Sequence, residues 1–310
     1  MASHDDIARA AADEPNVARH ALPLLALGGD RSVRELIDRA LEQDDPQLQE
    51  AAWCAMAYSS HPRLKDVLAA GLQGEQAATA ARWLAVASSA QDAAELLRRA
   101  QAAPTMELID AVGWAGSSDA VAPLIDLLRQ GNKALAPTIA QALERITGAR
   151  LMEEVLVAPE DIEPPDVPEP DVGEPPAASV AELTGDPRDL PGEGSPDKLQ
   201  RPSTDGRRWQ SWWERARQRF SAATRYRRGS PYSALVSWNE LDRGPCSPDE
   251  RLWLQRELIL RSGGYVPLDP SDLVAEQVLA LAAWEPQARA AATAPGAWSI
   301  PRRVRGYEPL

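Results

Sequence analysis

The residue types that most often carry out catalysis or bind metals are few in this sequence and are not grouped. The only histidines are His4, His20 and His61, and the two cysteines, Cys54 and Cys246, are far apart with no CxxC or Cys/His spacing. We therefore expect neither a structural zinc site nor a disulfide framework. The sequence also contains no GxxxxGK[ST] phosphate loop and no GxSxG nucleophile turn. These observations predict a protein that is not an enzyme and that uses no cofactor and no metal.

Arginine and tryptophan are the residue types here that could form a binding surface. Residues 203–228 combine many arginines with Trp209, Trp212 and Trp213. Arginines interleaved with aromatic rings can follow a nucleic-acid backbone and stack on its bases. The three tryptophans share one helical stripe, however, and such stripes usually bury, so we expect a core ridge with a solvated arginine face. Nucleic acid is therefore not the expected partner, and a nucleic-acid-binding module is kept as an alternative function.

A 29-residue repeat sets the positions of residues in the N-terminal half. The pairs Ser59-Ser60, Ser88-Ser89 and Ser117-Ser118 follow this step. Three apolar columns keep it as well: Leu48, Ala77, Met106, Leu135; Ala52, Ala81, Asp110, Ile139; and Met56, Ala85, Trp114, Leu143. Within each unit these positions lie at i, i+4 and i+8 of one helix, and another apolar helix precedes it. Because such a pair cannot cover its own apolar face, neighbouring pairs must stack into an α-solenoid.

These helix pairs resemble HEAT repeats of the short bacterial type, for example in the segment RLKDVLAAGLQGEQAATAARWLAVASS. The ordered motifs ITG (146–148), WQSWW (209–213), YRRGSPY (226–232) and PLDPSDLVAEQ (267–277) resemble a bacterial family of HEAT-repeat proteins often encoded among type VI secretion genes. The resemblance implies an accessory or adaptor role beside secretion genes and supplies no catalytic residues. A HEAT-type enzyme such as a bilin-lyase-like protein is a further alternative, although no motif supports it. No histidine precedes a glutamate, so the iron ligands of HEAT-repeat hydroxylases are missing.

The composition divides the chain into three parts. Residues 1–157 hold the solenoid, residues 158–203 are acidic and proline-rich, and residues 204–310 hold the remaining tryptophan-rich sequence. The middle part has too few apolar residues to fold, so it is expected to be a disordered linker. The predicted fold class is all-α: a HEAT-like α-solenoid, the linker, and a tryptophan-rich helical C-terminal part. With no apolar leader and no apolar run long enough for a membrane span, we expect a cytoplasmic protein without a membrane partner.

Helix signals are clear in the C-terminal part. Asp205 can cap a helix that carries the tryptophan stripe, and Ser247 with Glu250 forms a capping box with Pro248 at the first helical position. That second helix is expected to stop at Gly263. Further helices are predicted over 232–243 and 271–284.

Four residues of the solenoid are candidates for contacting a partner. Trp53, Arg82 and Trp83 fall off the core columns on second helices, which in HEAT arrays line the concave face where partners usually dock. Tryptophan and arginine are enriched at interface hot spots, although the two tryptophans could instead fill gaps left by the many alanines. Asp110 interrupts an apolar column, where a lone buried carboxylate would be costly. We expect its helix to rotate so that Leu108, Ile109 and Val112 face inward.

Together with Trp209, Trp212 and Trp213, these four residues make up the candidate partner-binding set. The expected function is a non-enzymatic protein-binding scaffold, an adaptor or a chaperone-like accessory protein. Its partner would be another protein, such as a secreted effector or a secretion component.

Overall fold

The computed structural model describes residues 4–28, 33–157, 197–244, 246–269, 271–292 and 294–298. It is mostly helical, which confirms the coarse fold class. The helices of the N-terminal half are α1 (His4–Asp13), α2 (Pro15–Gly28), α3 (Val33–Glu42), α4 (Pro46–Tyr58), α5 (Leu64–Gly71), α6 (Ala77–Val86), α7 (Ala90–Ala102), α8 (Met106–Ala115), α9 (Val121–Arg129) and α10 (Ala136–Thr147), with a short 3-10 turn, η1 (Ser118–Ala120), before α9.

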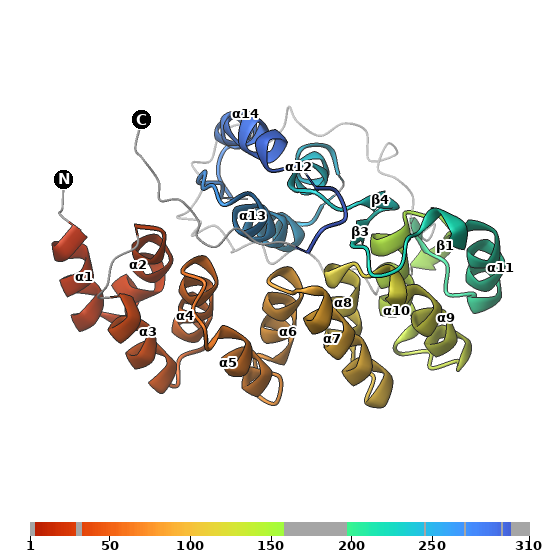
Figure 1. Cartoon of the computed structure of the whole chain (residues 1–310), viewed down its shortest axis with the longest axis horizontal. Helices are drawn as coiled ribbons and strands as arrows, with labels where there is room; N and C mark the ends of the chain where they lie inside the picture. Colours follow the sequence, from red (N-terminus) through yellow and green to blue (C-terminus); the bar gives the residue numbers. More distant parts are fainter. Residues whose placement is uncertain are drawn as a thin grey trace, which may run out of the picture.

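These helices stand side by side in a curved row (Figure 1). The even-numbered helices pack on one another, α2 on α4, α6 on α8 and α8 on α10, while α3, α5, α7 and α9 pack behind them. Two of the predicted columns are buried at nearly every position, for example at Ala52, Met56 and Leu143. The first column is not uniform, because Met106 at the start of α8 remains 54% exposed. The row also opens at one point, since α4 and α6 approach each other less closely than the other pairs.

A two-stranded antiparallel sheet follows the row and was not predicted. Strand β1 (Met152–Val157) pairs with β2 (Asp197–Pro202). The backbone N–H of Ser203 then donates to the carbonyl of Leu151 at 2.6 Å. The expected linker boundary at residue 203 is therefore wrong, because backbone hydrogen bonds hold residues 197–203 even though their side chains show no strand pattern. The other residues of the expected linker, 158–196, lie outside the described residues.

Helix α11 (Gly206–Ala216) begins at the predicted cap, where the Asp205 carboxylate accepts from the backbone N–H groups of Arg207 and Arg208. It packs on α9 at the end of the row and continues into a 3-10 turn, η4 (Arg217–Arg219). The chain then turns back over the row as a short hairpin, β3 (Tyr226–Arg227) and β4 (Ser230–Pro231).

The hairpin crosses the ends of α8 and α10 at two glycines. Gly116 and Gly148 end these helices with φ values of 75° and 56°, in the left-handed region. A Cβ on Gly116 would collide with the carbonyl oxygen of Tyr226, and one on Gly148 with that of Arg228. Glycine is thus required at both positions for backbone shape and for the close approach of the crossing chain.

Three helices complete the fold and lie over the concave side of the row (Figure 1). They are α12 (Ala234–Arg243), α13 (Pro248–Ser262) and α14 (Val274–Ala291). The capping box predicted for α13 is present, and the helix ends at Gly263 as expected. Helix α13 contacts both α4 and α6, so it bridges the point where the row opens.

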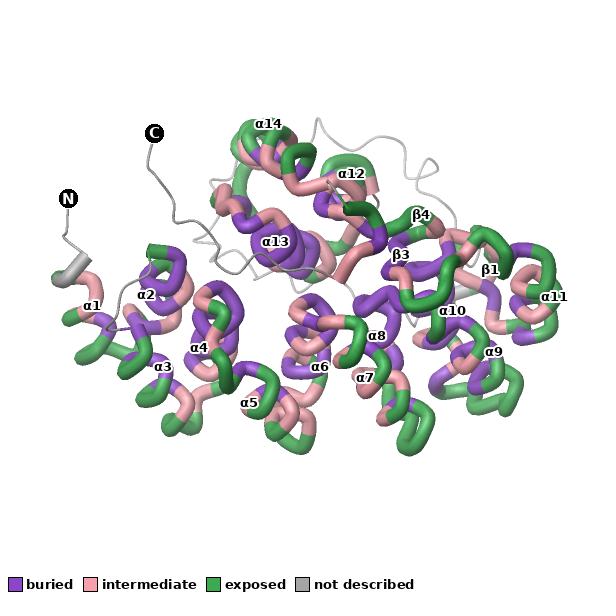
Figure 2. Tube along the Cα trace, viewed as in Figure 1, coloured by how far each residue is buried: buried purple, intermediate pink, exposed green. Residues whose placement is uncertain are grey.

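Helix α14 lies outermost, and much of its length is exposed (Figure 2). Its inner face buries Leu281, Trp284 and Ala288. Leu279, on the outer side, is 71% exposed, and Leu273, Val274 and Val278 are exposed as well. Among the described residues no helix is both long and apolar enough to cross a bilayer.

A buried carboxylate fastens the crossing segment and α13 to the row. Glu257 of α13 is fully buried and forms ion pairs with Arg225 and with Arg227, whose Nη2 lies 2.8 Å from Oε2. The hydroxyl of Ser237 donates to the same oxygen at 2.9 Å. Arg225 in turn donates from Nε to the carbonyl of Ala115 at 2.9 Å, at the end of α8. One carboxylate therefore joins α12, α13 and the crossing segment, and Arg225 carries the link on to α8.

Replacing this carboxylate should be strongly destabilising. We expect Glu257→Gln to lower the free energy of unfolding by about 3–5 kcal/mol, because it leaves the buried Arg225 without its counter-charge and Arg227 with only Glu240 at 3.8 Å. Urea unfolding of the full chain measures this loss. Glu95→Gln, which breaks only exposed pairs with Arg98 and Arg99 on α7, is the matched control and should leave the unfolding midpoint unchanged. Equal midpoints for the two variants would contradict the role given to Glu257.

The same group predicts a specific acid sensitivity. Burial alone would raise the pKa of Glu257, but the charges of Arg227 and Arg225 outweigh this effect and lower the pKa below its ordinary value of 4.5. Its ion pairing therefore stabilises the fold above about pH 4.5, and this contribution is lost as the pH falls through the lower folded-state pKa. Thermal midpoints measured from pH 7 to pH 3 should fall further for the wild type than for Glu257→Gln. Parallel curves for the two proteins would contradict this assignment.

Candidate functional site

Two of the concave residues predicted to bind a partner, Arg82 and Trp83, are in contact with the chain's own α13. Arg82 donates from Nε to Asp110 at 2.9 Å and also pairs with Asp249 at the start of α13. Arg145 bridges the same two elements, with Nη1 at 2.8 Å from Asp110 and Nη2 at 3.2 Å from Glu250. Arg82 and Asp110 thus face an intramolecular partner, where the sequence analysis expected another protein.

Asp110 remains on the packed face, so the expected helix rotation does not remove it from the interior. Ile109 and Val112 are buried as expected and Leu108 is half-buried, but the Asp110 side chain is itself only 20% exposed. Burial alone would raise the pKa of Asp110, but Arg145 and Arg82 outweigh this effect and lower it. The carboxylate is tolerated inside because two arginines neutralise it.

Trp83 is fully buried under the same helix. Its ring meets that of Trp253 edge to face, with centroids 5.3 Å apart, and the guanidinium of Arg256 lies 5.1 Å from the Trp83 centroid. Arg256 also pairs with Glu50 of α4 at 2.7 Å. Trp83 therefore belongs to the contact between the row and α13 and is not on a free surface.

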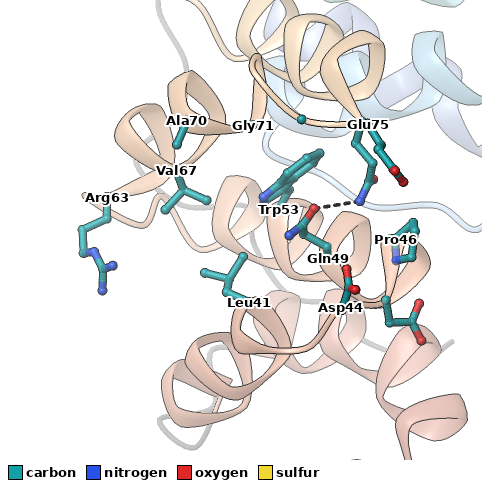
Figure 3. A pocket seen from close by; sticks show the side chains of 13 residues that line it. Leu41, Asp44, Pro46, Gln49, Trp53, Arg63, Val67, Ala70, Gly71 and Glu75 are labelled. Atoms are coloured by element: carbon teal, nitrogen blue, oxygen red, sulfur yellow. Dashed lines mark hydrogen bonds between the residues drawn. The ribbon is translucent and has the colours of Figure 1, made fainter.

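Trp53 lies instead at an open groove between two helix pairs, with a cavity volume of about 490 Å³ (Figure 3). Its walls come from the end of α3, the start of α4, the helix α5 and the turn before α6. The lining residues are Leu41, Asp44, Asp45, Pro46, Gln49, Trp53, Arg63, Val67, Ala70, Gly71, Gly74, Glu75 and Gln76. The groove lies beside the point where α4 and α6 diverge.

The Trp53 indole forms the floor of this groove. Figure 3 shows it between Val67 and Leu41 on one side and Gln49 on the other, with the ring nitrogen turned toward Val67. Trp53 is 98% buried, with 2% of its surface exposed, and its Nε1–H has no acceptor. Trp83, Trp114 and Trp284 also hold an indole N–H without an acceptor, but none of these three lines the groove. Because Nε1 is itself buried, a ligand carbonyl can reach this donor only if the indole turns toward the groove.

Some polar side chains of the groove have hydrogen-bond or ion-pair partners, and others have no ion-pair partner among the described residues. Asp45 caps α4 and pairs with Arg19, and that guanidinium together with the Leu48 N–H lowers its pKa. The Gln76 amide donates to Gln49 at 2.7 Å across the groove. Asp44 and Glu75 are exposed and have no ion-pair partner among the described residues. The rim therefore keeps negative charge that a cationic ligand group could neutralise.

The tryptophan stripe of α11 is divided between core and surface. Trp209 is fully buried and donates from Nε1 to the Ser203 carbonyl at 2.7 Å. Trp213 is half-buried and packs against Phe220, with ring centroids 5.2 Å apart. Trp212 is also half-buried, and its ring stacks on that of Trp213 at a centroid distance of 6.2 Å. The expectation that the whole stripe is core therefore holds for Trp209 only.

The described part of the chain contains no group of histidine, cysteine, aspartate or glutamate side chains arranged to hold a metal ion. Cys54 and Cys246 are both free thiols.

Comparison of the chain with protein-family models, with curated proteins and with solved structures gives no match. The resemblance to the family associated with type VI secretion therefore remains a prediction from the sequence motifs.

The sequence did not predict the residues that complete the contact with α13 and the groove at Trp53. Asp249 and Glu250 were predicted as first-turn residues of a helix, where acidic side chains are common because of the helix dipole. Nothing local shows that they face Arg82 and Arg145 of the distant row. The charges of the groove, Asp44 and Glu75, lie in turns where acidic residues are ordinary. Only the position of Trp53 off the core columns pointed to the groove.

The different burial of Trp209 and Trp213 on α11 predicts unequal effects of truncation. Trp209→Ala should lower the free energy of unfolding by about 3–5 kcal/mol, because it removes a fully buried ring together with its hydrogen bond. Trp213→Ala should cost about 1–2 kcal/mol, because that ring is partly in solvent. Urea unfolding of both variants makes the comparison, with the exposed Arg217→Gln as the control that should not change stability. A larger loss for Trp213→Ala than for Trp209→Ala would contradict the observed burial.

Proposed function

We propose that this chain is a protein-binding adaptor, built on a HEAT-like α-solenoid, that holds an extended segment of another protein in the groove above Trp53. The observation that carries the proposal is an open groove with an aromatic floor, an apolar wall and the unpaired charges of Asp44 and Glu75 on its rim. An extended peptide also has a backbone carbonyl at every residue, which can accept from the Trp53 indole N–H once that ring turns toward the groove. The adaptor role was expected from the repeats, and the groove is the location that we propose for it.

The chemistry of the groove describes the segment that would fit. Leu41, Val67 and Ala70 offer an apolar wall for an aliphatic side chain. The free charges of Asp44 and Glu75 on the rim favour a lysine or arginine beside it. The ligand class is thus an extended segment with alternating apolar and basic side chains. If the resemblance to the secretion-associated family holds, that segment belongs to a secreted effector or a secretion component.

Panning a random 12-residue phage-display library on the immobilised full chain tests the proposal. Enriched peptides should carry basic residues, and Asp44→Asn with Glu75→Gln should weaken them about tenfold or more. Asp126→Asn with Glu214→Gln removes the same charge from exposed positions on α9 and α11 and is the matched control. Enriched peptides that bind both double variants equally would contradict the groove as the site.

The indole donor has its own test with the same peptides. Trp53→Phe keeps an aromatic ring on the floor but removes the N–H, and we expect peptide affinity to fall about 5- to 15-fold, as for one hydrogen bond to a buried donor. Trp284→Phe removes another indole N–H without an acceptor, far from the groove, and should leave affinity unchanged. Fluorescence anisotropy of a labelled enriched peptide measures both. Equal affinities for wild type and Trp53→Phe would show that the donor plays no part.

A further inference from the structure

The outer side of α11 carries a pattern that the adaptor groove does not explain. Arg208, Trp212 and Arg215 follow one another at i, i+4 and i+7, so they share one face of the helix. Both arginines are exposed and Trp212, on the same face, is half-buried. This set of three residues is called the α11 stripe below.

The charge of the stripe is not neutralised within the described residues. Arg208 donates to the Met152 carbonyl and to the Ser203 hydroxyl, both at 3.3 Å, and Arg215 donates from Nε to the Ser211 carbonyl at 3.1 Å. None of these acceptors is a carboxylate. Arg217 and Arg219, in the turn that follows, are exposed and likewise have no carboxylate partner among the described residues. Elsewhere in the chain exposed arginines such as Arg98 and Arg243 pair with a neighbouring acid.

The aromatic part of the stripe is held rigidly. The Trp212 ring meets the rings of Trp209 and Phe220 edge to face at centroid distances of 6.2 and 6.1 Å, and it stacks on Trp213. Trp209 is itself fixed by its hydrogen bond to Ser203. Little entropy therefore remains to be lost when a flat ligand packs on the exposed part of Trp212.

We infer that the α11 stripe is a docking site for single-stranded nucleic acid. A helix rises about 1.5 Å per residue, so the two guanidinium-bearing positions lie about 6 Å before and about 4.5 Å after Trp212 along the axis. One ring between two cations suits one unstacked base with a phosphate on either side. Duplex bases are already stacked on each other and cannot use the ring. An acidic polypeptide could pair with the arginines but has no base to place against Trp212.

The inference is independent of the groove, because α11 lies at the opposite end of the row from α3, α4 and α5 (Figure 1). It also revises the expectation that nucleic acid is not a partner. That expectation took the whole tryptophan stripe as core, whereas Trp212 is only half-buried and shares its helix face with two exposed arginines.

Fluorescence anisotropy with labelled oligo(dT) of 20 nucleotides tests the inference on the full chain. Binding should weaken as salt rises, with a log–log slope of about −0.7 for each phosphate contacted. Arg208→Gln with Arg215→Gln should reduce affinity at least tenfold and make the slope shallower by about 1.4, for two lost phosphate contacts. Arg98→Gln with Arg243→Gln changes the net charge equally on α7 and α12 and should leave both affinity and slope unchanged.

Trp212→Leu separates stacking from charge. It should reduce affinity about tenfold at every salt concentration while the slope stays the same, because stacking releases no counterions. Thermal unfolding of Trp212→Leu checks that the helix remains folded. If this variant unfolds, the arginine variants still test the site. The inference is overturned if the control double variant loses as much affinity as Arg208→Gln with Arg215→Gln. It is also overturned if polyglutamate binds as tightly as oligo(dT), which would make the stripe a site for acidic polypeptide.

Discussion

The carboxylate of Glu257 is the group on which the arrangement of the two halves depends. It lies inside the protein between Arg225 and Arg227, and these arginines belong to the segment that crosses the ends of α8 and α10. A buried carboxylate without partners would be too costly to keep in the interior. Because Glu257 needs Arg225 and Arg227 beside it, α13 is held in the one position where these ion pairs form. The helix is thereby set over the concave side, where its first turn meets Arg82 and Arg145 and its middle meets Trp83.

Filling the concave side changes which surfaces remain open for other molecules. In an open helical array the inner helices present tryptophan and arginine to a partner, whereas here Arg82 and Trp83 face α13. The groove at Trp53, beside the point where α4 and α6 diverge, and the outer side of α11 are not covered by α13. The apolar side chains of α14 that face solvent are open as well.

The sequence predicted the parts of this fold that depend on neighbours in the chain. The 29-residue columns placed the even-numbered helices, and the capping residues Asp205 and Ser247 placed the starts of α11 and α13. The sequence did not predict the contacts between the two halves, because Arg82 and Asp249 are far apart in the chain and each is ordinary in its own helix. Strand β2 was missed for a similar reason: its polar side chains carry no signal, and its partner β1 lies on the far side of an acidic segment. Of the residues that line the groove, only Trp53 was predicted from the sequence. The opening beside it depends on how two repeats pack, which the sequence does not show.

The pairing of β1 with β2 has a consequence for how the chain tolerates changes in length. In their register Val157 lies opposite Asp197, so the two ends of residues 158–196 are held about 5 Å apart whatever lies between them. The entropy lost on closing a flexible loop rises only with the logarithm of its length, by about 0.6 kcal/mol for each doubling. Sequence can therefore be added or removed here at little cost to the folded parts, even a whole domain whose termini lie close together. An equal insertion at Gly116 or Gly148 would force apart the crossing chain and the helix ends that touch there.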